Sequence, residues 1–259
     1  MEAGECFTPP SGKTRFGVMG ILKIFRLWVL LGLSVLAAAG AELSSLTGCR
    51  LVPTPWADGD SFQIRTSGGA LHTVRLYGVD CIEWHVTDDT DARRLRAQRR
   101  YFGISEFGGS PAASIEMAKH FGELAAKEVA VLLKQPFTVH TAYVDGGGDP
   151  RYKRVYAFVT TAGGQDLAEV LVRKGLARAF GVYRETPAGE PAAEYRAYMQ
   201  DLEFQAAQKG VGVWTHTAWD LLPEERLAER KETADLRVAV APAKLPIGTK
   251  INPNTAAPE

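Results

Sequence analysis

The sequence predicts a mainly β fold with helices (α+β), built as a five-stranded barrel with three helices. Three successive strand-like runs, separated by turn signals, occupy the region up to residue 79. A long helical pattern then precedes two further strand patterns, and two shorter helical patterns follow. The chain has 259 residues, of which 46% are hydrophobic and 23% are charged, and this composition is typical of a globular domain with appended ends.

The first three predicted strands surround the segment Asp58-Gly59-Asp60. One apolar run begins at Cys49 and ends at this segment, and Phe62-Gln63-Ile64 begins a second run with period-2 alternation. The third run, Leu71–Val79, follows the turn signal Ser67-Gly68-Gly69. We therefore expect three consecutive antiparallel strands.

Acidic residues stand at two places in this meander that should meet in space. Asp58 and Asp60 lie at one end of a strand pair, and Asp80 and Glu83 follow the third strand, with Arg75 within that strand. Because alternate ends of a meander coincide, these side chains should converge. Carboxylates form an oxygen cage suited to Ca²⁺ or Mg²⁺, arginine binds phosphate oxygens, and a further carboxylate can take a proton from water. This combination indicates phosphodiester hydrolysis.

The remaining elements complete the predicted barrel. The helical repeat of apolar residues indicates a long helix over Ser114–Leu133. Strands are predicted over Gln135–Val144 and Tyr152–Thr160, and shorter helices over Asp166–Lys174 and Pro191–Lys209. Five strands with a helix between the third and fourth are the order of an OB-fold barrel.

An arginine-rich segment at about residues 84–113 interrupts this pattern as an insertion. Five arginines occur within Arg93–Arg100. One interpretation is a solvated helix with charge pairs at i,i+4 spacing. The other is a basic arm that leaves directly after Glu83 and holds a nucleic-acid backbone. The charge pattern alone supports both equally.

Residues 1–41 are predicted to be a secretory signal peptide with cleavage after Ala41. The apolar run Leu27–Ala39 is shorter than the roughly 20 residues that a spanning helix needs. Translation could start at the first residue or at Met19. We expect a secreted or periplasmic protein; the alternative is a membrane-anchored form, or one lipidated at Cys49.

The other end of the chain, residues 217–259, is charged and then rich in proline and alanine, and it is expected to be a flexible tail. Without residues 1–41, the chain carries 26 basic and 28 acidic residues. Nucleic-acid binders usually show an overall basic excess. Any contact with nucleic acid must therefore come from local clusters.

These motifs resemble the thermonuclease family, whose members are similar to staphylococcal nuclease and are built on the OB-fold. The family pattern D-G-D-[TS] reads Asp58-Gly59-Asp60-Ser61 here, and R-x4-D-x2-E reads Arg75…Asp80…Glu83. Its later Y-x-R reads Tyr152-Lys153-Arg154. The resemblance places a thermonuclease-like domain at about residues 49–216.

The resemblance implies a calcium site. Asp60, Asp80 and the backbone carbonyl of Cys81 would bind Ca²⁺, and Asp58 would hold a water molecule on the ion. A carbonyl ligand tolerates any side chain, so a cysteine suits this position.

The resemblance also implies catalytic roles. Arg75 and Arg154 would bind the scissile phosphate and stabilise the charge that develops on it, and Glu83 would be the general base. The family commonly has proline before this glutamate, where this chain has Ile82. The implied substrate-binding residues are Tyr183, Arg151 and Tyr152.

The function implied is that of a secreted calcium-dependent endonuclease acting on DNA and/or RNA. We expect a monomer with no stable protein partner, and membrane contact only through an uncleaved N-terminal segment. The alternative is a non-catalytic OB-fold module that binds single-stranded nucleic acid.

Overall fold

The computed structural model describes residues 41–147 and 153–240. The predicted signal peptide up to residue 40, the substrate residues Arg151 and Tyr152, and the end of the predicted tail from residue 241 lie outside the described residues. The contact pattern separates Met1–Glu42 from Leu43–Glu259, and the fold described below is that of the second unit.

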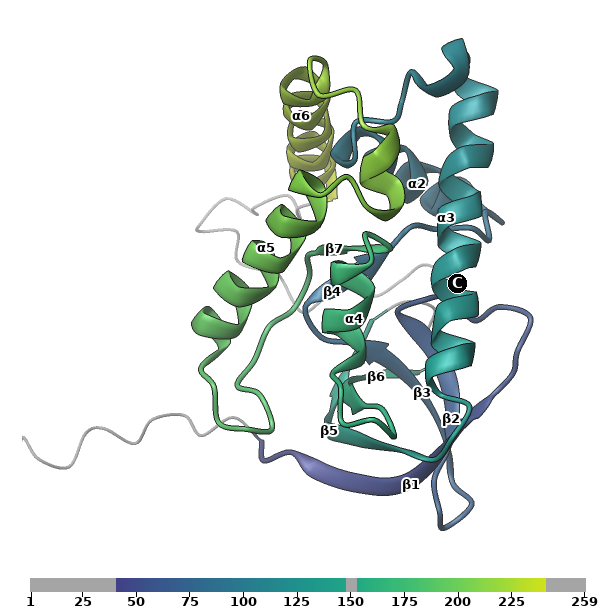
Figure 1. Ribbon diagram of the computed structural model, residues 1–259, viewed down its shortest axis with the longest axis vertical. Coiled ribbons are helices and arrows are strands. Elements are labelled where there is room, and N and C mark those ends of the chain that lie inside the picture. The colour runs from purple at the N-terminus through teal and green to yellow at the C-terminus, as the bar shows by residue number, and fades with distance from the viewer. Residues whose placement is uncertain (1–40, 148–152, 241–259) are drawn as a thin grey trace, which may run out of the picture. The chain divides into compact units, whose positions relative to one another are not determined.

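Five strands form the predicted barrel (Figure 1). They close in the order β1-β2-β3-β6-β5. Neighbouring strands are antiparallel except β3 and β6, which run parallel. The strands are β1 (Ser44–Val52), β2 (Ser61–Arg65), β3 (Leu71–Leu76), β5 (Phe137–Asp145) and β6 (Arg154–Thr160).

A second, two-stranded sheet leaves the barrel directly after β3. The predicted run Leu71–Val79 is broken at Gly78, whose φ of 73° is readily adopted only by glycine. The chain then forms β4 (Val79–Cys81), which pairs antiparallel with β7 (Ala177–Ala179). This sheet brings the segment after residue 79 next to a part of the chain that follows the barrel.

The three predicted helices are present. They are α3 (Pro111–Leu132), α4 (Leu167–Arg173) and α5 (Ala192–Gln208). Helix α3 begins three residues earlier than expected because Ser110 is its N-cap, accepting a hydrogen bond from the backbone of Ala113. Asp166 caps α4 as the sequence suggested.

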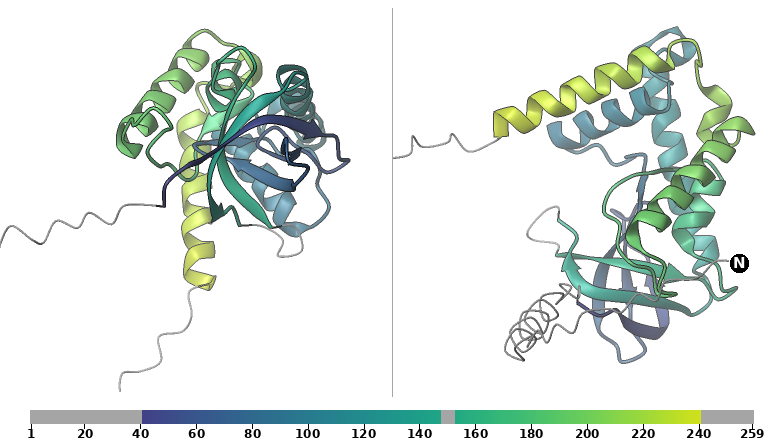
Figure 2. Two further views of the ribbon diagram at one scale, coloured as in Figure 1. Left: turned by 90° about the horizontal axis from the view of Figure 1, so that it is seen from below. Right: turned by 90° about the vertical axis from the view of Figure 1, so that its left-hand side faces the viewer.

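Among the residues that the structure describes, two more α-helices lie outside the predicted set, with 3₁₀ turns at Phe107–Gly109 and Gly212–His216. The insertion contains α2 (Asp89–Tyr101), and the end of the described chain is α6 (Leu222–Val240). The prediction of a flexible tail is therefore wrong for Leu222–Val240. Figures 1 and 2 show α6 running beside α2. The physical reason is long-range pairing, because Glu232 on α6 forms ion pairs with arginines of α2.

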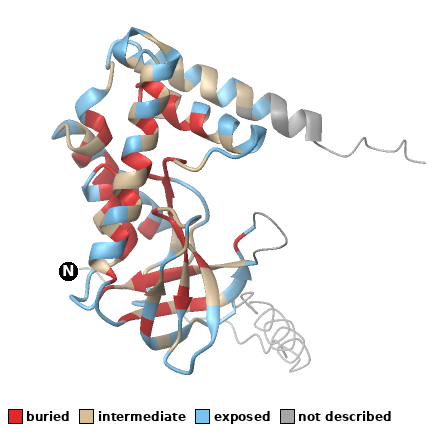
Figure 3. Ribbon diagram, turned by 90° about the vertical axis from the view of Figure 1, so that its right-hand side faces the viewer, coloured by how far each residue is buried: buried red, intermediate tan, exposed pale blue. Residues whose placement is uncertain are grey.

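Buried residues run through the barrel strands and along α3 (Figure 3). Phe62, Ile64 and Val139 fill the barrel, and Ala125 and Val129 of α3 belong to the same core. Within residues 41–147 and 153–240, none of the helices combines the length and apolar character that crossing a membrane requires.

Candidate functional site

The turn before β2 and the strand β4 are joined through acidic side chains. Asp58 Oδ1 accepts hydrogen bonds from the backbone N–H groups of Asp60 (3.1 Å) and Ser61 (2.6 Å). Asp60 Oδ2 accepts one from the backbone N–H of Cys81 (2.8 Å), and its Oδ1 accepts one from the Ser61 hydroxyl (2.9 Å). The two acid-bearing segments therefore meet, as the meander predicts.

Two glycines allow these segments to lie against α3. A Cβ atom at Gly59 would lie 2.6 Å from the Cys81 sulfur and 2.7 Å from the Ala125 Cβ. At Gly122, within α3, it would lie 2.3 Å from the carbonyl oxygen of Ile82. Both approaches are too close for any side chain. Helix α3 thus supports the acid-bearing turn and the segment after β4 by direct backbone contact.

Two arginines from different strands converge on one oxygen. Arg75 in β3 forms ion pairs with Asp60 (3.0 Å) and Asp80 (2.9 Å), and its Nη1 lies 3.5 Å from Ser61 Oγ. Arg154, at the start of β6, donates to the same Ser61 oxygen at 3.2 Å. The structure therefore brings together the two arginines that the sequence assigned to phosphate binding.

Helix α2 contributes Gln98, which the sequence reasoning missed. Its side chain is fully buried, and its Oε1 accepts a hydrogen bond from the backbone N–H of Glu83 (2.8 Å). Its Nε2 donates to the carbonyl oxygen of Cys81 (2.7 Å) and to Asp80 Oδ2 (2.9 Å). A single amide thus holds the backbone on both sides of Ile82. No sequence motif marks a lone glutamine for such a role.

One arginine of α2 also reaches the acids. Arg94 Nη2 lies 2.5 Å from Glu83 Oε1 and 3.9 Å from Asp80 Oδ1. Other arginines of the helix point elsewhere: Arg99 donates to the Ser114 hydroxyl, and Arg96 pairs with Glu232. The insertion is therefore more than a solvated helix, because it places one guanidinium group inside the site.

A further buried arginine lies across the small sheet. Arg178 is directly opposite Asp80 in the β4–β7 register, and its Nε donates to Asp80 Oδ2 at 2.9 Å. Its guanidinium carbon lies 4.8 Å from the ring centre of Tyr101 and 4.2 Å from that of Phe180. The sequence signal that could have identified Arg178 as a buried functional residue was its position within the otherwise apolar segment Ala177–Phe180. Sequence alone did not reveal its partner.

The arginines keep Asp80 ionised. Burial opposes its charge, but Arg178, Arg75 and Arg94 outweigh burial and hold the pKa of this carboxyl well below its usual range. The surrounding guanidinium groups therefore favour the ionised form of Asp80.

Glu83 and Asp58 are shifted in the opposite direction. Burial raises the pKa of Glu83 to about 7, the charges of Asp60 and Asp80 add to this effect, and Arg94 counteracts part of it. Burial also raises the pKa of Asp58 well above its ordinary value, with further contributions from Asp60 and Glu83. The site thus combines one acid whose pKa is lowered with two acids whose pKa values are raised.

Comparison with known proteins agrees with this geometry. Residues 73–216 match the family described as staphylococcal nuclease homologue, and this segment is more than half of the chain. The chain belongs to the staphylococcal nuclease homologue family. A search of curated proteins found none that matches.

Membership of the staphylococcal nuclease homologue family supports a nuclease-like protein that acts on nucleic acid. The matched segment includes Arg75, Asp80, Glu83 and Arg154, and it also includes the α2 insertion. Asp58 and Asp60 precede the matched segment, so the family match does not cover them. They are assigned to the site because Asp60 contacts Cys81.

The third implied substrate residue, Tyr183, lies in an aromatic group behind β4. Its ring packs against Tyr195, with the ring centres 6.0 Å apart, and the guanidinium carbon of Arg196 lies 5.0 Å from its ring centre. A Cβ at Gly78 would lie 3.0 Å from its ring. Burial raises the pKa of the Tyr183 hydroxyl to about 12. The hydroxyl is therefore neutral, and the ring is held by packing.

The oxygen atoms expected to bind calcium are of the right chemical type and lie around Arg75 and the backbone of Cys81. Asp60 and Asp80 both contact Arg75, and the backbone N–H of Cys81 bonds to Asp60. Oxygen ligands of this kind suit Ca²⁺. Among the described residues, however, no three side chains of His, Cys, Asp or Glu form a group able to hold a metal. Arginine and glutamine donors occupy several positions around these oxygens.

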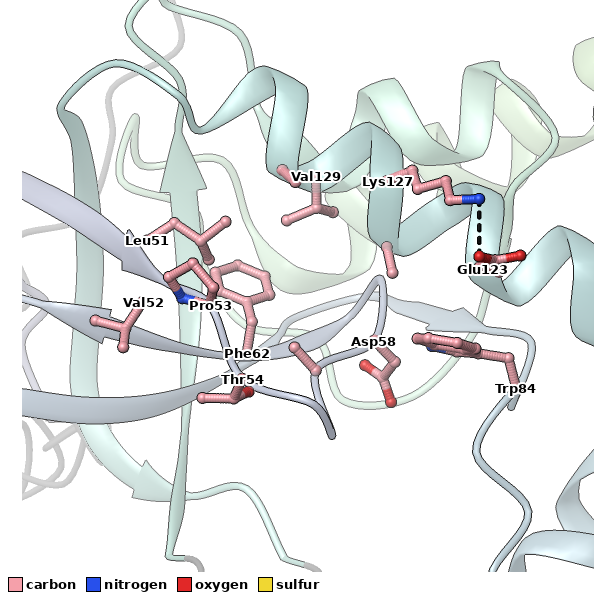
Figure 4. A pocket seen from close by; sticks show the side chains of 13 residues that line it. Leu51, Val52, Pro53, Thr54, Asp58, Phe62, Trp84, Glu123, Lys127 and Val129 are labelled. Atoms are coloured by element: carbon pink, nitrogen blue, oxygen red, sulfur yellow. Dashed lines mark ion pairs between the residues drawn. The ribbon is translucent and has the colours of Figure 1, made fainter.

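An apolar pocket of about 240 Å³ opens next to the acid-bearing turn (Figure 4). Asp58 lies at one side of it, Trp84 lies beside Asp58, and Phe62 and Val129 form part of the wall. On α3, Lys127 pairs with Glu123 at 2.7 Å. The pocket thus begins where the acid site ends, and Trp84 directly follows Glu83 in the chain.

Proposed function

We propose that the protein is a calcium-dependent endonuclease that hydrolyses phosphodiester bonds of DNA and/or RNA. The observation that carries the proposal is the convergence of Arg75 and Arg154 on Ser61 Oγ, within a site that also contains a buried Glu83. Phosphodiester cleavage needs cationic groups at the phosphate and a base for water. Residues of both kinds meet here.

Arg75 and Arg154 would bind the phosphate through two guanidinium groups. Their planar N–H donors match phosphate oxygens in a way that lysine does not. Negative charge increases on these oxygens as water attacks, so donors that are already in place stabilise the transition state. Loss of one such donor typically costs ~10²–10³ in rate.

Glu83 would take the proton from the attacking water. With a pKa of about 7, a substantial fraction of Glu83 is ionised at neutral pH, and its carboxylate is a stronger base than an ordinary glutamate. The hydrogen bond between its backbone N–H and Gln98 fixes its position.

Asp60, Asp80 and the carbonyl of Cys81 would hold Ca²⁺, with Asp58 beside them. The bound ion would supply Lewis-acid chemistry and neutralise phosphate charge. Asp80 is suited to this role because it stays ionised. The apolar pocket beside Asp58 and Trp84 would accept a nucleobase, since aromatic rings stack on bases.

Export of the protein is part of the proposal, supported by the charged flank and apolar run before Ala41. Mass spectrometry of the mature N-terminus tests it. A mature chain that starts at residue 42 would support secretion or periplasmic export. Retention of the apolar run, or a lipid on Cys49, would contradict simple cleavage.

Plasmid nicking by the purified chain from Glu42 tests the activity. Cleavage should require added Ca²⁺ and stop with EDTA. Glu83→Gln and Arg154→Ala should each lose at least ~10²-fold in rate while circular dichroism shows an unchanged fold. Arg93→Ala, an exposed arginine of α2, is the control and should cleave normally. Nucleic-acid binding without cleavage under any metal condition would instead indicate a non-catalytic binding module.

A further inference from the structure

The site contains as many guanidinium groups as carboxylates. Ordinary carboxylate clusters recruit a metal ion because uncompensated negative charges repel one another. Here that repulsion is already compensated by side chains, so a divalent ion must compete with resident cations. The carboxylates belong to Asp58, Asp60, Asp80 and Glu83, and the guanidinium groups belong to Arg75, Arg94, Arg154 and Arg178.

Asp80 shows this competition most directly, because both of its oxygens are surrounded by donors. Oδ1 lies 2.9 Å from Arg75 and 3.9 Å from Arg94. Oδ2 lies 2.9 Å from Gln98 and 2.9 Å from Arg178. A carboxylate offers about four lone-pair sites, and Arg75, Gln98 and Arg178 occupy three of them. The remaining site is on Oδ1, where Arg94 is the next nearest cation, so a metal ion that binds there must compete with Arg94.

Arg94 is the donor that can leave most readily. Its contact with Asp80 is the longest of the four, and 35% of its side chain is exposed, against 12% for Arg75 and 7% for Arg178. Arg75 is held within the barrel strand β3, and Arg178 is held by the register of the small sheet. Arg94 instead reaches the acids from the surface of α2.

We propose that Arg94 is a displaceable counter-cation, which competes with a divalent metal ion for the carboxylate of Asp80. In the metal-free protein its guanidinium group partly neutralises Asp80 and forms an ion pair with Glu83. When the ion binds, Arg94 withdraws from Asp80 and keeps its ion pair with Glu83. The proposal rests on the proposed function only for the choice of Ca²⁺ as the ion.

Removal of Arg94 should therefore strengthen metal binding. The ion would no longer have to displace Arg94 from Asp80, and it would enter a site with one positive charge fewer. Coupling between groups of this kind typically changes affinity about 5- to 150-fold. We expect at least a fivefold decrease in the Kd for Ca²⁺.

Isothermal titration of CaCl₂ into the full-length protein, without nucleic acid, tests the proposal. The pH should be 8.5, above the Glu83 pKa of about 7. Arg94→Ala and Arg94→Met, which keeps the aliphatic stem, should each bind Ca²⁺ at least fivefold more tightly than the parent protein. Arg94→Lys, which keeps the charge, should have a Kd for Ca²⁺ between that of the parent and that of the neutral variants. Arg93→Ala is the matched control: it removes the same charge from the exposed neighbour, and its affinity should equal that of the parent.

Equal or weaker binding by both neutral Arg94 variants, relative to Arg93→Ala, would overturn the proposal, as would a lack of binding by every variant. If circular dichroism shows that Arg94→Ala alone is misfolded, the Ca²⁺ affinity of Arg94→Met decides the outcome. Cleavage assays are read separately. If Ca²⁺ binding tightens in a protein that never cleaves nucleic acid, the role of Arg94 stands and the proposed nuclease activity fails.

Discussion

The backbone N–H of Glu83 donates a 2.8 Å hydrogen bond to the side-chain oxygen of Gln98. Since the same amide also donates to the carbonyl of Cys81, Gln98 fixes the chain on both sides of Ile82. The thermonuclease pattern commonly has proline at that position, where the ring restrains the backbone. In this chain a side chain from the inserted helix restrains it instead.

Gln98 should therefore matter to the chemical step as a positioning residue. We expect Gln98→Ala and the nearly isosteric Gln98→Glu to lower kcat about 10- to 100-fold, the range seen when groups that orient metal ligands are lost. KM should change much less, because the side-chain amide of Gln98 bonds to Asp80 and to the backbone of Cys81 and Glu83 rather than to the phosphate-binding arginines, among the described residues. Steady-state kinetics on an oligonucleotide measure both constants.

Gln205→Ala is the control for this experiment, because the side-chain amide of Gln205 donates to Asp201 on the exposed side of α5, away from the site. It should leave kcat and KM unchanged. A Gln98 variant that loses thermal stability but keeps kcat would show that the amide serves folding alone.

The pH dependence of cleavage should report on Glu83 and Arg94. The base must be ionised, so kcat/KM should rise as pH increases through the Glu83 pKa of about 7. The positive charge of Arg94 favours the ionised form and lowers this pKa. In Arg94→Ala the rising limb should therefore move to higher pH.

This profile is measured at one saturating calcium concentration, because a nearby metal also shifts the pKa. Arg93→Ala should superimpose on the parent curve. A limb that stays in place, or moves to lower pH in Arg94→Ala, would contradict the assignment of Glu83 as the base.

Gly122 in α3 should be intolerant of even the smallest side chain. A Cβ there would lie 2.3 Å from the carbonyl oxygen of Ile82, which is backbone and cannot rotate away. We expect Gly122→Ala to push α3 from the segment that carries Glu83, and to destabilise the protein by about 1–3 kcal/mol. The free energy of unfolding measured in urea and the rate of cleavage should both decrease.

Gly163→Ala is the matched comparison, because the nearest atom to its added Cβ is 3.8 Å away. That variant should unfold and cleave like the parent. Parent-like stability and activity in Gly122→Ala would show that the contact between α3 and the site can relax without cost.

Glu232 should contribute modestly to stability. It pairs with Arg96 at 2.7 Å and with Arg100, and all three side chains are between 29% and 46% exposed. Pairs this exposed are worth up to about 1 kcal/mol. Glu232→Ala should therefore lower Tm by only a few degrees and leave cleavage nearly unchanged.

A double-mutant cycle with Arg100→Ala, read by thermal unfolding, isolates the pair. The destabilisations of the two single variants should add up to more than the destabilisation of the double variant, and the difference, the coupling energy, should be a few tenths of a kcal/mol or more. Full additivity would mean that α6 is held on α2 by its other contacts, such as the hydrogen bond from Arg226 to the carbonyl of Tyr101.

The sequence predicted those features that follow from local periodicity and chain geometry. The barrel order came from strand alternation and turn residues, and the meeting of Asp60 with the segment after β3 followed from the meander itself. Resemblance to the thermonuclease family selected Arg75 and Arg154, which converge on Ser61. Where one element's position is set by its neighbour in the chain, sequence reasoning succeeded.

The rest depends on contacts between distant segments. Arg178 meets Asp80 across a separation of 98 residues, through a strand pairing that has no local signal. Gln98 is a neutral side chain whose role appears only when α2 is placed over β4. Helix α6 has a charged composition that resembles a solvated tail, and packing against α2 gives it a fixed partner.

The ion pair between Arg96 and Glu232 joins residues that are 136 positions apart in the chain. A ribosome therefore releases the inserted helix long before the residue that anchors it. During synthesis, Gln98 and Arg94 would already lie near the acids while the outer side of their helix still awaited its partner. A nascent chain stalled before α6 would have the complete set of catalytic side chains, carried on a helix without its final restraint.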